Sequence, residues 1–236
     1  MENALDTAVW TALTTRHERF ALGTGQARRF DPDVAPFAAA RDDDPESLAA
    51  LADLLKEGET DVYLMQRADI VLPATLTAPM TAPGVQMIRR RPDAVRPVAV
   101  RSVAEAIIRL SEADIPEMHA LVELTRPGPF RTRTFELGEF WGIRIDGRLA
   151  AMAGERLKVP GFTEVSGVCS HPDFRGKGLA AALSDFVARR IEARGEIPFL
   201  HAFAGNAAAI RLYERLGFDL RCGVNVAVLE KPAAAA

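Results

Sequence analysis

The stretch that decides the fold is Gly167-Val-Cys-Ser-His-Pro-Asp-Phe-Arg-Gly-Lys-Gly-Leu-Ala180. Its first residues, Val168 to Ser170, suit a buried strand. His171-Pro-Asp173 is typical of a tight turn, because proline fixes φ and aspartate can bond its own backbone. Apolar residues then recur with the period of a helix, at Leu179, Leu183, Phe186, Val187 and Ile191. The stretch therefore predicts a strand, a turn and the start of a helix.

The expected helix start has the properties of a phosphate-binding site. The first turn of a helix carries free N–H groups and the positive end of the helix dipole. Gly176 and Gly178 let the backbone approach an anion closely, and Arg175 and Lys177 add positive charge. Two common phosphate motifs do not fit. No Ser or Thr follows Lys177 as in a P-loop, and Ala181 breaks the glycine spacing of a dinucleotide fingerprint.

A second pattern occupies residues 199–218. It predicts a strand followed by a helix that begins after Asn206, a favourable N-cap residue. Gly217 suits a left-handed C-cap, and Phe218 can make the closing hydrophobic contact. The apolar face of this helix consists of Ile210, Tyr213 and Leu216.

Together the two patterns resemble the GNAT superfamily of N-acetyltransferases. Arg175-x-x-Gly178-x-Ala180 is similar to the loop with which that family grips the pyrophosphate of coenzyme A, and residues 199–218 are similar to its C-terminal motif. The resemblance covers about residues 105–230. It implies an α/β (α+β) GNAT fold, with a mixed central β-sheet flanked by helices. The pairing with a diverged front half is also similar to the glycine-N-acyltransferase-like branch.

We expect two domains. Residues 1–95 indicate a smaller α+β domain, in keeping with a degenerate GNAT-like unit, and residues 105–236 the acetyltransferase domain. Residues 96–104 follow a proline-rich region and are the expected linker. The expected helices cover residues 5–20 and 44–56 and begin after residue 111 or 114, 178 and 206. The expected strands cover residues 61–65, 85–88, 107–110, 140–145, 148–153, 163–170, 198–203, 218–221 and 225–229, with an Asp146-Gly147 hairpin turn of type I′.

Composition indicates an ordinary globular protein of 236 residues, 48% hydrophobic and 26% charged, with a net charge of −3. That charge gives no reason to expect a nucleic acid or an anionic membrane as a partner. No membrane-spanning run or signal peptide is visible, and the two cysteines do not suggest a disulfide framework, so we expect a cytoplasmic protein. The histidines are scattered, and a solvated loop with a helix cap explains the acidic run at residues 42–44, so we expect no metal.

The resemblance implies which residues hold acetyl-CoA. Backbone N–H groups of the loop and the charge of Arg175 would bind the pyrophosphate. N–H groups of residues 168–170 would bind the pantetheine arm and stabilise negative charge on the thioester oxygen. Gly167 would help that strand bend, unless it is only a small residue suited to packing. The expected cofactor-binding residues are Val168, Cys169, Ser170, Arg175, Gly176, Lys177, Gly178, Leu179, Ala180, Asn206, Ala209 and Tyr213.

Tyr213 and Glu164 are the expected catalytic residues. Tyr213 resembles the family's general acid, and a phenol that is neutral at pH 7 can protonate a leaving thiolate. The alternative is a half-buried core tyrosine. Glu164 is the candidate general base, with His201, Glu155 or a chain of water molecules as alternatives and a surface glutamate as the structural explanation. Cys169 is not expected to act as a nucleophile, since direct transfer needs none.

The expected function is transfer of an acetyl group from acetyl-CoA to an amine, by default a small molecule or an amino acid. Acetyl-CoA is the co-substrate, and the protein would act as a monomer or homodimer. Two alternatives stay open: a protein-directed acetyltransferase, and a catalytically inactive module that binds or senses CoA. Residues 1–95 are expected to cover one side of the acceptor site or to form a partner interface.

Overall fold

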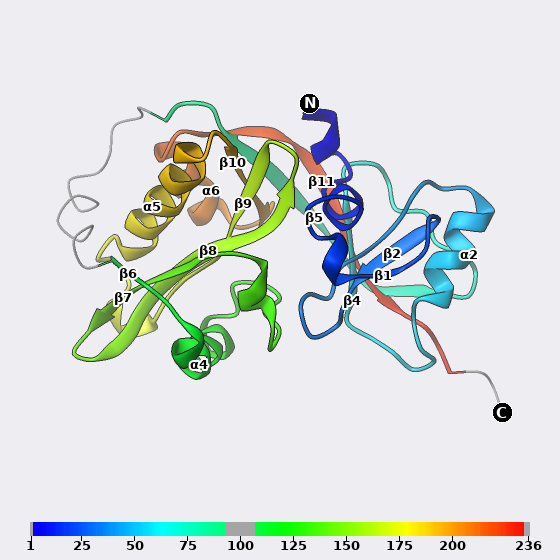
Figure 1. Ribbon diagram of the computed structural model, residues 1–236, viewed down its shortest axis with the longest axis horizontal. Helices are drawn as coiled ribbons and strands as arrows, with labels where there is room; N and C mark the ends of the chain where they lie inside the picture. Colours follow the sequence, from blue (N-terminus) through cyan, green and yellow to red (C-terminus); the bar gives the residue numbers. More distant parts are fainter. Residues whose placement is uncertain (1, 93–106, 234–236) are drawn as a thin grey trace.

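Two sheets organise the chain (Figure 1). The computed structural model describes residues 2–92 and 107–233. Within these residues the main sheet has eight strands, in the order β4-β11-β5-β10-β9-β8-β7-β6. They are β4 (Val62–Gln66), β5 (Thr77–Arg89), β6 (Ile107–Arg109), β7 (Phe140–Ile145), β8 (Arg148–Val159), β9 (Phe162–Ser170), β10 (Ile197–Phe203) and β11 (Phe218–Glu230). The small sheet consists of β1 (Ala21–Gly23), β2 (Ala27–Phe30) and β3 (Ala38–Ala40).

Three of the described α-helices pack on the main sheet in two separate cores. The helices are α1 (Ala8–Leu13), α2 (Pro45–Asp53), α4 (Ile115–Thr125), α5 (Leu179–Ala193) and α6 (Ala207–Arg215). Short 3-10 turns cover Glu2–Leu5, Glu18–Phe20, Glu112–Asp114, Thr134–Leu137 and Pro172–Phe174. Helices α5 and α6 share one core, and α4 belongs to another. The sequence neighbours Val168 and Cys169 fall in these two different cores, as expected when adjacent strand residues face opposite sides of a sheet. This confirms the expected α/β architecture, a mixed sheet flanked by helices.

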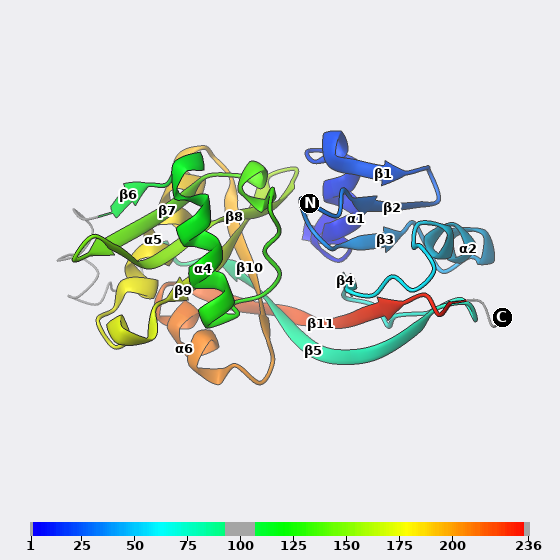
Figure 2. The same ribbon diagram turned by 90° about the horizontal axis from the view of Figure 1, so that it is seen from below.

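Strands from the first 92 residues take part in the main sheet. β5 lies between β10 and β11 and is antiparallel to both. β4 pairs with the other edge of β11, and the ribbon of β5 and β11 extends toward the small sheet (Figure 2). The sheet thus joins residues 1–95 to residues 105–236. The expected linker at residues 96–104 lies outside the described residues, and the division into two domains stays a prediction.

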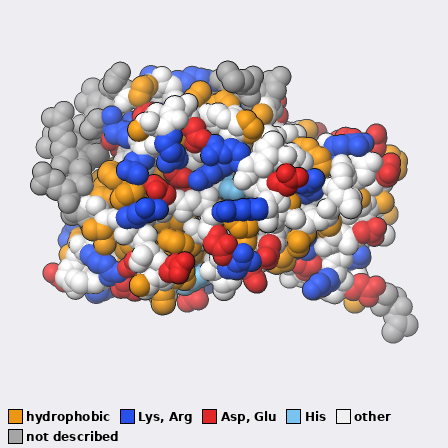
Figure 3. Space-filling model, in the orientation of Figure 1, with side chains coloured by type: hydrophobic (Ala, Val, Ile, Leu, Met, Phe, Trp, Pro, Cys, Tyr) orange, Lys and Arg blue, Asp and Glu red, His pale blue; other side chains and the backbone are white. Residues whose placement is uncertain are grey.

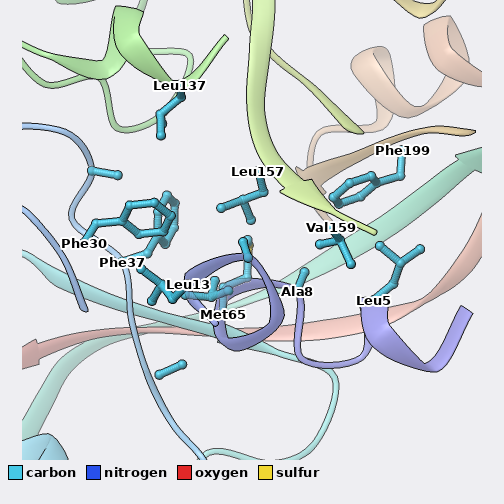
Figure 4. Close-up of a cluster of buried hydrophobic side chains, with 14 of the residues drawn as sticks. Leu5, Ala8, Leu13, Phe30, Phe37, Met65, Leu137, Leu157, Val159 and Phe199 are labelled. Atoms are coloured by element: carbon cyan, nitrogen blue, oxygen red, sulfur yellow. The ribbon is translucent and has the colours of Figure 1, made fainter. Parts of the chain in front are cut away.

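A shared hydrophobic core ties the front of the chain to the main sheet. Leu5 and Leu13 meet Leu157 and Val159 of β8 and Phe199 of β10 in one buried cluster (Figure 4). Each of these five side chains is at most 1% exposed. Burying one large apolar side chain contributes about 1.5–3 kcal/mol. The first residues are therefore an integral part of the fold.

The expected elements are mostly present. The hairpin of β7 and β8 turns at Asp146 and Gly147, whose φ angles of 51° and 76° fit the expected type I′ turn. The two strands expected at residues 218–221 and 225–229 are wrong in that they form one strand, β11. A register shift between Leu220 and Cys222 absorbs an extra residue there without ending the strand.

The helix expected over residues 5–20 is wrong in extent. α1 ends at Leu13, and a separate 3-10 turn spans Glu18–Phe20. At the end of α1 the Thr14 hydroxyl donates to the Trp10 carbonyl at 2.9 Å, a side-chain bond that competes with regular helix. The chain then turns and brings His17 into the core.

His17 is buried where this turn meets β8. Its Nε2 accepts from the N–H of Lys158 at 3.0 Å and lies 2.9 Å from the carbonyl oxygen of Arg156. The ring packs against Phe20 and Phe30. Burial lowers the pKa of this imidazole to about 4, because the charged ring would lose its hydration. The folded protein therefore keeps His17 neutral at pH 7.

We expect His17 to make stability fall between pH 6.5 and pH 4. As the pH falls, the unfolded chain protonates this ring near its ordinary pKa of 6.5, whereas the folded chain does so only near pH 4. The unfolded state thus binds more protons in this window, and the folded state loses about 3 kcal/mol across it. Urea unfolding at several pH values measures this loss.

His17→Gln removes the titrating group and should flatten that part of the pH profile. Equal slopes for wild type and His17→Gln between pH 6.5 and 4.5 would contradict the assignment.

Candidate active site

β9 and β10 separate after Glu164 of β9. They pair in parallel only from Phe162 to Glu164 of β9, although β9 continues to Ser170. Past Glu164, β9 stays paired with β8. Its other edge faces no strand in the described part of the chain, so the backbone groups along that edge are open to another partner.

β9 also bends at Gly167. The φ of this residue is 63°, a left-handed value that residues with a Cβ disfavour. Two residues of β9, Gly167 and Val168, lie opposite Ala153 of β8, which is a β-bulge. A Cβ at Gly167 would come 3.1 Å from Cε1 of Phe140. Both observations favour the expected role of Gly167 in bending the strand.

A pocket opens beside this bend. It is lined by residues 165–168 of β9 and by the loop of residues 127–130. The side chains that complete the wall are Thr134, Phe140, Arg156, His201 and Tyr213. The pocket therefore brings together the bent strand, Tyr213 of α6 and two polar residues of β8 and β10.

The predicted phosphate loop follows β9 and the 3-10 turn at Pro172–Phe174. Gly176 and Gly178 have φ angles of 77° and 75°, and α5 begins without a side-chain cap. The first N–H groups of α5 therefore have no acceptor within the helix. Arg175 and Lys177 are exposed, and neither forms an ion pair with a described carboxylate. Free donors, two left-handed glycines and two unpaired cations fit the pyrophosphate of CoA.

The remaining cofactor-binding predictions lie around this loop. Leu179 and Ala180 form the first turn of α5. The Asn206 side-chain oxygen accepts from the N–H of Ala209 at 3.1 Å and so caps α6, as expected. The contact of these residues with CoA stays a prediction.

The part of β9 that has lost its pairing with β10 contains Val168, Cys169 and Ser170. Val168 lines the pocket, whereas Cys169 is buried toward α4. Burial raises the pKa of the Cys169 thiol to about 11. A neutral buried thiol is a poor nucleophile, which agrees with the expectation that transfer does not pass through Cys169.

Tyr213 reaches the pocket from α6. It is 8% exposed, and its ring packs edge-on against Phe218 with centroids 6.0 Å apart. Burial raises the pKa of the phenol to about 12, so the hydroxyl is protonated at neutral pH and able to donate. Position and protonation both suit a general acid, and that role stays a prediction.

Glu164 is fully buried at the point where β9 and β10 separate. Its carboxylate accepts from Nε and Nη2 of Arg156 at 2.8 and 2.7 Å, and from the N–H of Leu157 at 3.2 Å. Nδ1 of His201 lies 2.7 Å from Oε1. Burial alone would raise the pKa of this carboxyl, but Arg156 and His201 outweigh it and hold the pKa well below its usual range.

These surroundings do not suit Glu164 as a direct base. A carboxylate with a low pKa and several donors around it is a weak proton acceptor. The alternative Glu155 is paired with Arg194 at 2.6 Å and Lys158 at 2.9 Å and does not line the pocket. The geometry instead favours a role for Glu164 in holding Arg156 and His201.

A chain of polar side chains continues from this cluster across the neighbouring strands. Nε2 of Gln86, in β5, donates to Nε2 of His201 and to the Leu5 carbonyl, both at 2.9 Å. Arg221, in β11, donates to Oε1 of Gln86 at 2.9 Å. These bonds place the ring hydrogen of neutral His201 on Nδ1, which donates to Glu164. Both ring nitrogens of His201 are thus engaged.

Sequence reasoning missed Arg156 and Gln86. Arg156 meets Glu164 only because the register of β8 and β9 shifts between Glu155 and Lys158, and residue types alone do not reveal such a shift. Gln86 did carry a signal, because it is the one polar residue of the run at residues 85–88. A polar side chain in a buried strand usually has a buried partner.

Two kinds of feature are absent from the described residues. None of the described helices has the length and apolar character needed to cross a membrane. In residues 2–92 and 107–233, no group of His, Cys, Asp and Glu side chains is arranged to hold a metal ion. Asp42 of the acidic run pairs with Arg41 at 2.8 Å.

Comparison with known proteins gives the same fold and family as the resemblance seen in the sequence. The family model described as FR47-like protein matches residues 141–226. The chain is 32% identical over 116 residues to the [ribosomal protein bS18]-alanine N-acetyltransferase of Salmonella typhimurium, covering 47% of this chain and 78% of that one. Identity to the protein of the same name from Escherichia coli is 30% over 119 residues, covering 48% and 80%.

Two solved structures extend the likeness over the whole chain. A GNAT-family protein from Novosphingobium aromaticivorans is 42% identical, with a TM-score of 0.87 and coverage of 97% of this chain and 99% of that one. A GCN5-related N-acetyltransferase from Kribbella flavida is 18% identical, with a TM-score of 0.60 and coverage of 97% and 96%, and so shows the fold alone. Sequence and structure agree, and the chain belongs to the GNAT superfamily, whose members are enzymes that transfer an acetyl group from acetyl-CoA to an amine.

Proposed function

We propose that this chain binds acetyl-CoA between the loop of residues 175–180 and the unpaired edge of β9, and acetylates an amine in the adjoining pocket. The observation that carries the proposal is the separation of β9 from β10, which leaves that edge free next to the left-handed glycines that open α5. Residues 164–180 thus contain the open strand edge, with the pocket beside it, and then the donors for the phosphates.

Each part of the site has a chemical task. Acetyl-CoA, when bound, supplies the activated acetyl group. N–H groups of residues 168–170 would hold the pantetheine arm and stabilise the developing oxyanion. Arg175, Lys177 and the first N–H groups of α5 would hold the pyrophosphate. Tyr213 keeps its proton at neutral pH and would give it to the departing thiolate.

The amine must lose a proton during transfer. Glu164 is held by Arg156, and both ring nitrogens of His201 are engaged by Glu164 and Gln86. Neither offers a free basic lone pair. We therefore assign Glu164 and His201 a positioning role. The proton of the amine would leave through water in the pocket, which is one of the alternatives to Glu164 that the sequence left open.

The front of the chain supports one wall of the pocket. The Thr134 hydroxyl donates to the Val34 carbonyl at 2.8 Å, and Arg133 pairs with Asp31 at 2.8 Å. Thr134 itself lines the pocket. These contacts support the expectation that residues 1–95 cover one side of the acceptor site.

We take an amine of a small molecule or an amino acid as the default acceptor, with a protein amino terminus as second candidate. The second candidate is favoured by the names of the curated relatives, which acetylate an alanine of a ribosomal protein. The face drawn in Figure 3 carries Lys and Arg side chains over its middle, but Asp and Glu side chains lie among them. That face therefore shows no uniformly basic or acidic surface for choosing a partner by charge alone. Cytoplasmic location and a monomer or homodimer stay predictions.

An assay of thiol release from acetyl-CoA tests the proposal. The acceptor panel would contain small alkylamines, amino acids, amino-acid amides and short peptides. We expect CoA release that depends on an amine and a product heavier by one acetyl group in mass spectrometry. Binding of acetyl-CoA without turnover on any amine would overturn the proposal in favour of a CoA-binding module.

A further inference from the structure

Arg156 is the one arginine that lines the pocket, within the part of the chain that the structure describes. It comes from β8, where a register shift sets it opposite Glu164, the last residue of β9 that pairs with β10, and its side chain is 11% exposed. A buried guanidinium without compensating contacts would destabilise the fold, because removing a charge from water carries a penalty of several kcal/mol. Its contacts show how that cost is offset.

Arg156 is held rigidly from three directions. Nε and Nη2 form a bidentate pair with Glu164 at 2.8 and 2.7 Å, which fixes the plane of the guanidinium. The ring of Phe37 lies beneath it, with the centroid 4.8 Å from Cζ. At the backbone, the Arg156 carbonyl oxygen lies 2.9 Å from Nε2 of His17. Two of these three supports come from the front of the chain.

The remaining terminal nitrogen, Nη1, has no acceptor among the described residues. It is also absent from the set of polar atoms that are sealed from solvent without a partner, which includes Nε of Arg89 and of Arg131. Nη1 is thus a fixed donor that solvent reaches. Because Arg156 lines the pocket, a molecule bound there can accept from it.

The charge around Arg156 indicates what kind of oxygen would bind. Glu164 already neutralises the guanidinium, and His201 is neutral in the tautomer that Gln86 and Glu164 impose. A carboxylate would add an unbalanced negative charge beside Glu164. A carbonyl oxygen carries no net charge and costs less to bury.

We propose that Arg156 orients the acceptor by donating from Nη1 to a neutral carbonyl oxygen next to the reacting amine. The acceptor class is then an α-amino amide, such as an amino-acid amide or the amino terminus of a peptide. Simple alkylamines lack the oxygen, and free amino acids present a carboxylate. This inference rests on the proposed function, since it names the substrate class of the same pocket.

The test compares kcat/KM for glycinamide, glycine, ethylamine and a peptide that begins with glycine. Wild type and Arg156→Lys would be measured side by side, so the different basicities of the amines cancel in the comparison. Lysine keeps the charge beside Glu164 but cannot serve Glu164 and a substrate in one plane. Arg144→Lys is the matched control. Arg144 forms an ion pair with Asp114, with 2.6 Å between Nη2 and Oδ1, and it does not line the pocket.

We expect Arg156→Lys to lower the preference for glycinamide over ethylamine by about 10- to 100-fold, the range for a hydrogen bond to a charged group. Acetyl-CoA binding and the Arg144→Lys preference should not change. The double variant Arg156→Met with Glu164→Gln, which leaves no unpaired charge, should lose the preference as well. It provides the same test if Arg156→Lys does not fold.

Three results would overturn the inference. They are an unchanged preference in both Arg156 variants, equal use of ethylamine and glycinamide by wild type, and better use of glycine than of glycinamide. All three leave the proposed function standing, because an amine is still acetylated. If wild type acetylates no amine although acetyl-CoA binds, the proposed function fails and the inference with it. A higher kcat/KM for the peptide or for glycinamide identifies the source of the carbonyl, and either supports the role of Arg156.

Discussion

Tyr213→Phe should lower kcat for acetyl transfer by about 10²- to 10⁴-fold, the usual contribution of a positioned general acid. The phenol lies in the pocket and keeps its proton, because burial raises its pKa to about 12. Phenylalanine keeps the ring and its edge-on contact with Phe218 but removes the hydroxyl. Steady-state kinetics should therefore show a loss in kcat with little change in the KM for acetyl-CoA.

The second tyrosine of the chain provides the control. Tyr63, in β4, packs against Phe37 and does not line the pocket. Tyr63→Phe removes the same hydroxyl elsewhere and should leave kcat within about twofold. A kcat for Tyr213→Phe that also stays within about twofold would remove Tyr213 from the chemistry and make it a packing residue.

Gly178→Glu should weaken acetyl-CoA binding by at least about 100-fold, which is close to 3 kcal/mol. The new carboxylate would stand at the N-terminus of α5, where we place the pyrophosphate, and repel it. A Cβ at φ 75° also strains the backbone by about 1–2 kcal/mol. The fold should survive, because a negative charge at a helix N-terminus is itself favourable. Isothermal titration with acetyl-CoA measures the effect.

Gly195→Glu is the matched control for the position of the change. Gly195 follows the other end of α5, has a φ of 77°, and a Cβ there meets nothing within 4 Å. This variant carries the same charge change and a similar backbone strain away from the loop. It should bind acetyl-CoA like wild type. Equal affinities for both variants would mean that the loop does not hold the phosphates.

The second half of the fold was predictable because its signals are local. Turn residues such as Asp146-Gly147 and the cap at Asn206 specify their own backbone geometry, and the structure has both where the sequence predicts them. The place of β5 between β10 and β11 was not predictable. Such pairing depends on contacts more than 100 residues apart, such as Ile88 with Phe199, which no short pattern encodes.

In the candidate site, too, local features were predictable and contacts between distant residues were not. The loop at Gly176 and Gly178 was visible, since glycine at a helix start points to a close backbone approach. The partners of Glu164 were not, and so its burial beside Arg156 and its lowered pKa could not be foreseen. A pKa is set by neighbours in space, and Arg156, His201 and Gln86 come from three different strands.

Isothermal titration of the wild-type protein with acetyl-CoA, beside dephospho-CoA and ATP, tests the central claim most directly. Our account predicts saturable binding of acetyl-CoA at one site, weaker binding of ATP, which lacks the pantetheine arm for the open edge of β9, and loss of acetyl-CoA binding in Gly178→Glu. No heat of binding with acetyl-CoA, or equal affinity for acetyl-CoA and ATP, would contradict it. In that case the loop and the open strand edge would not form a CoA site.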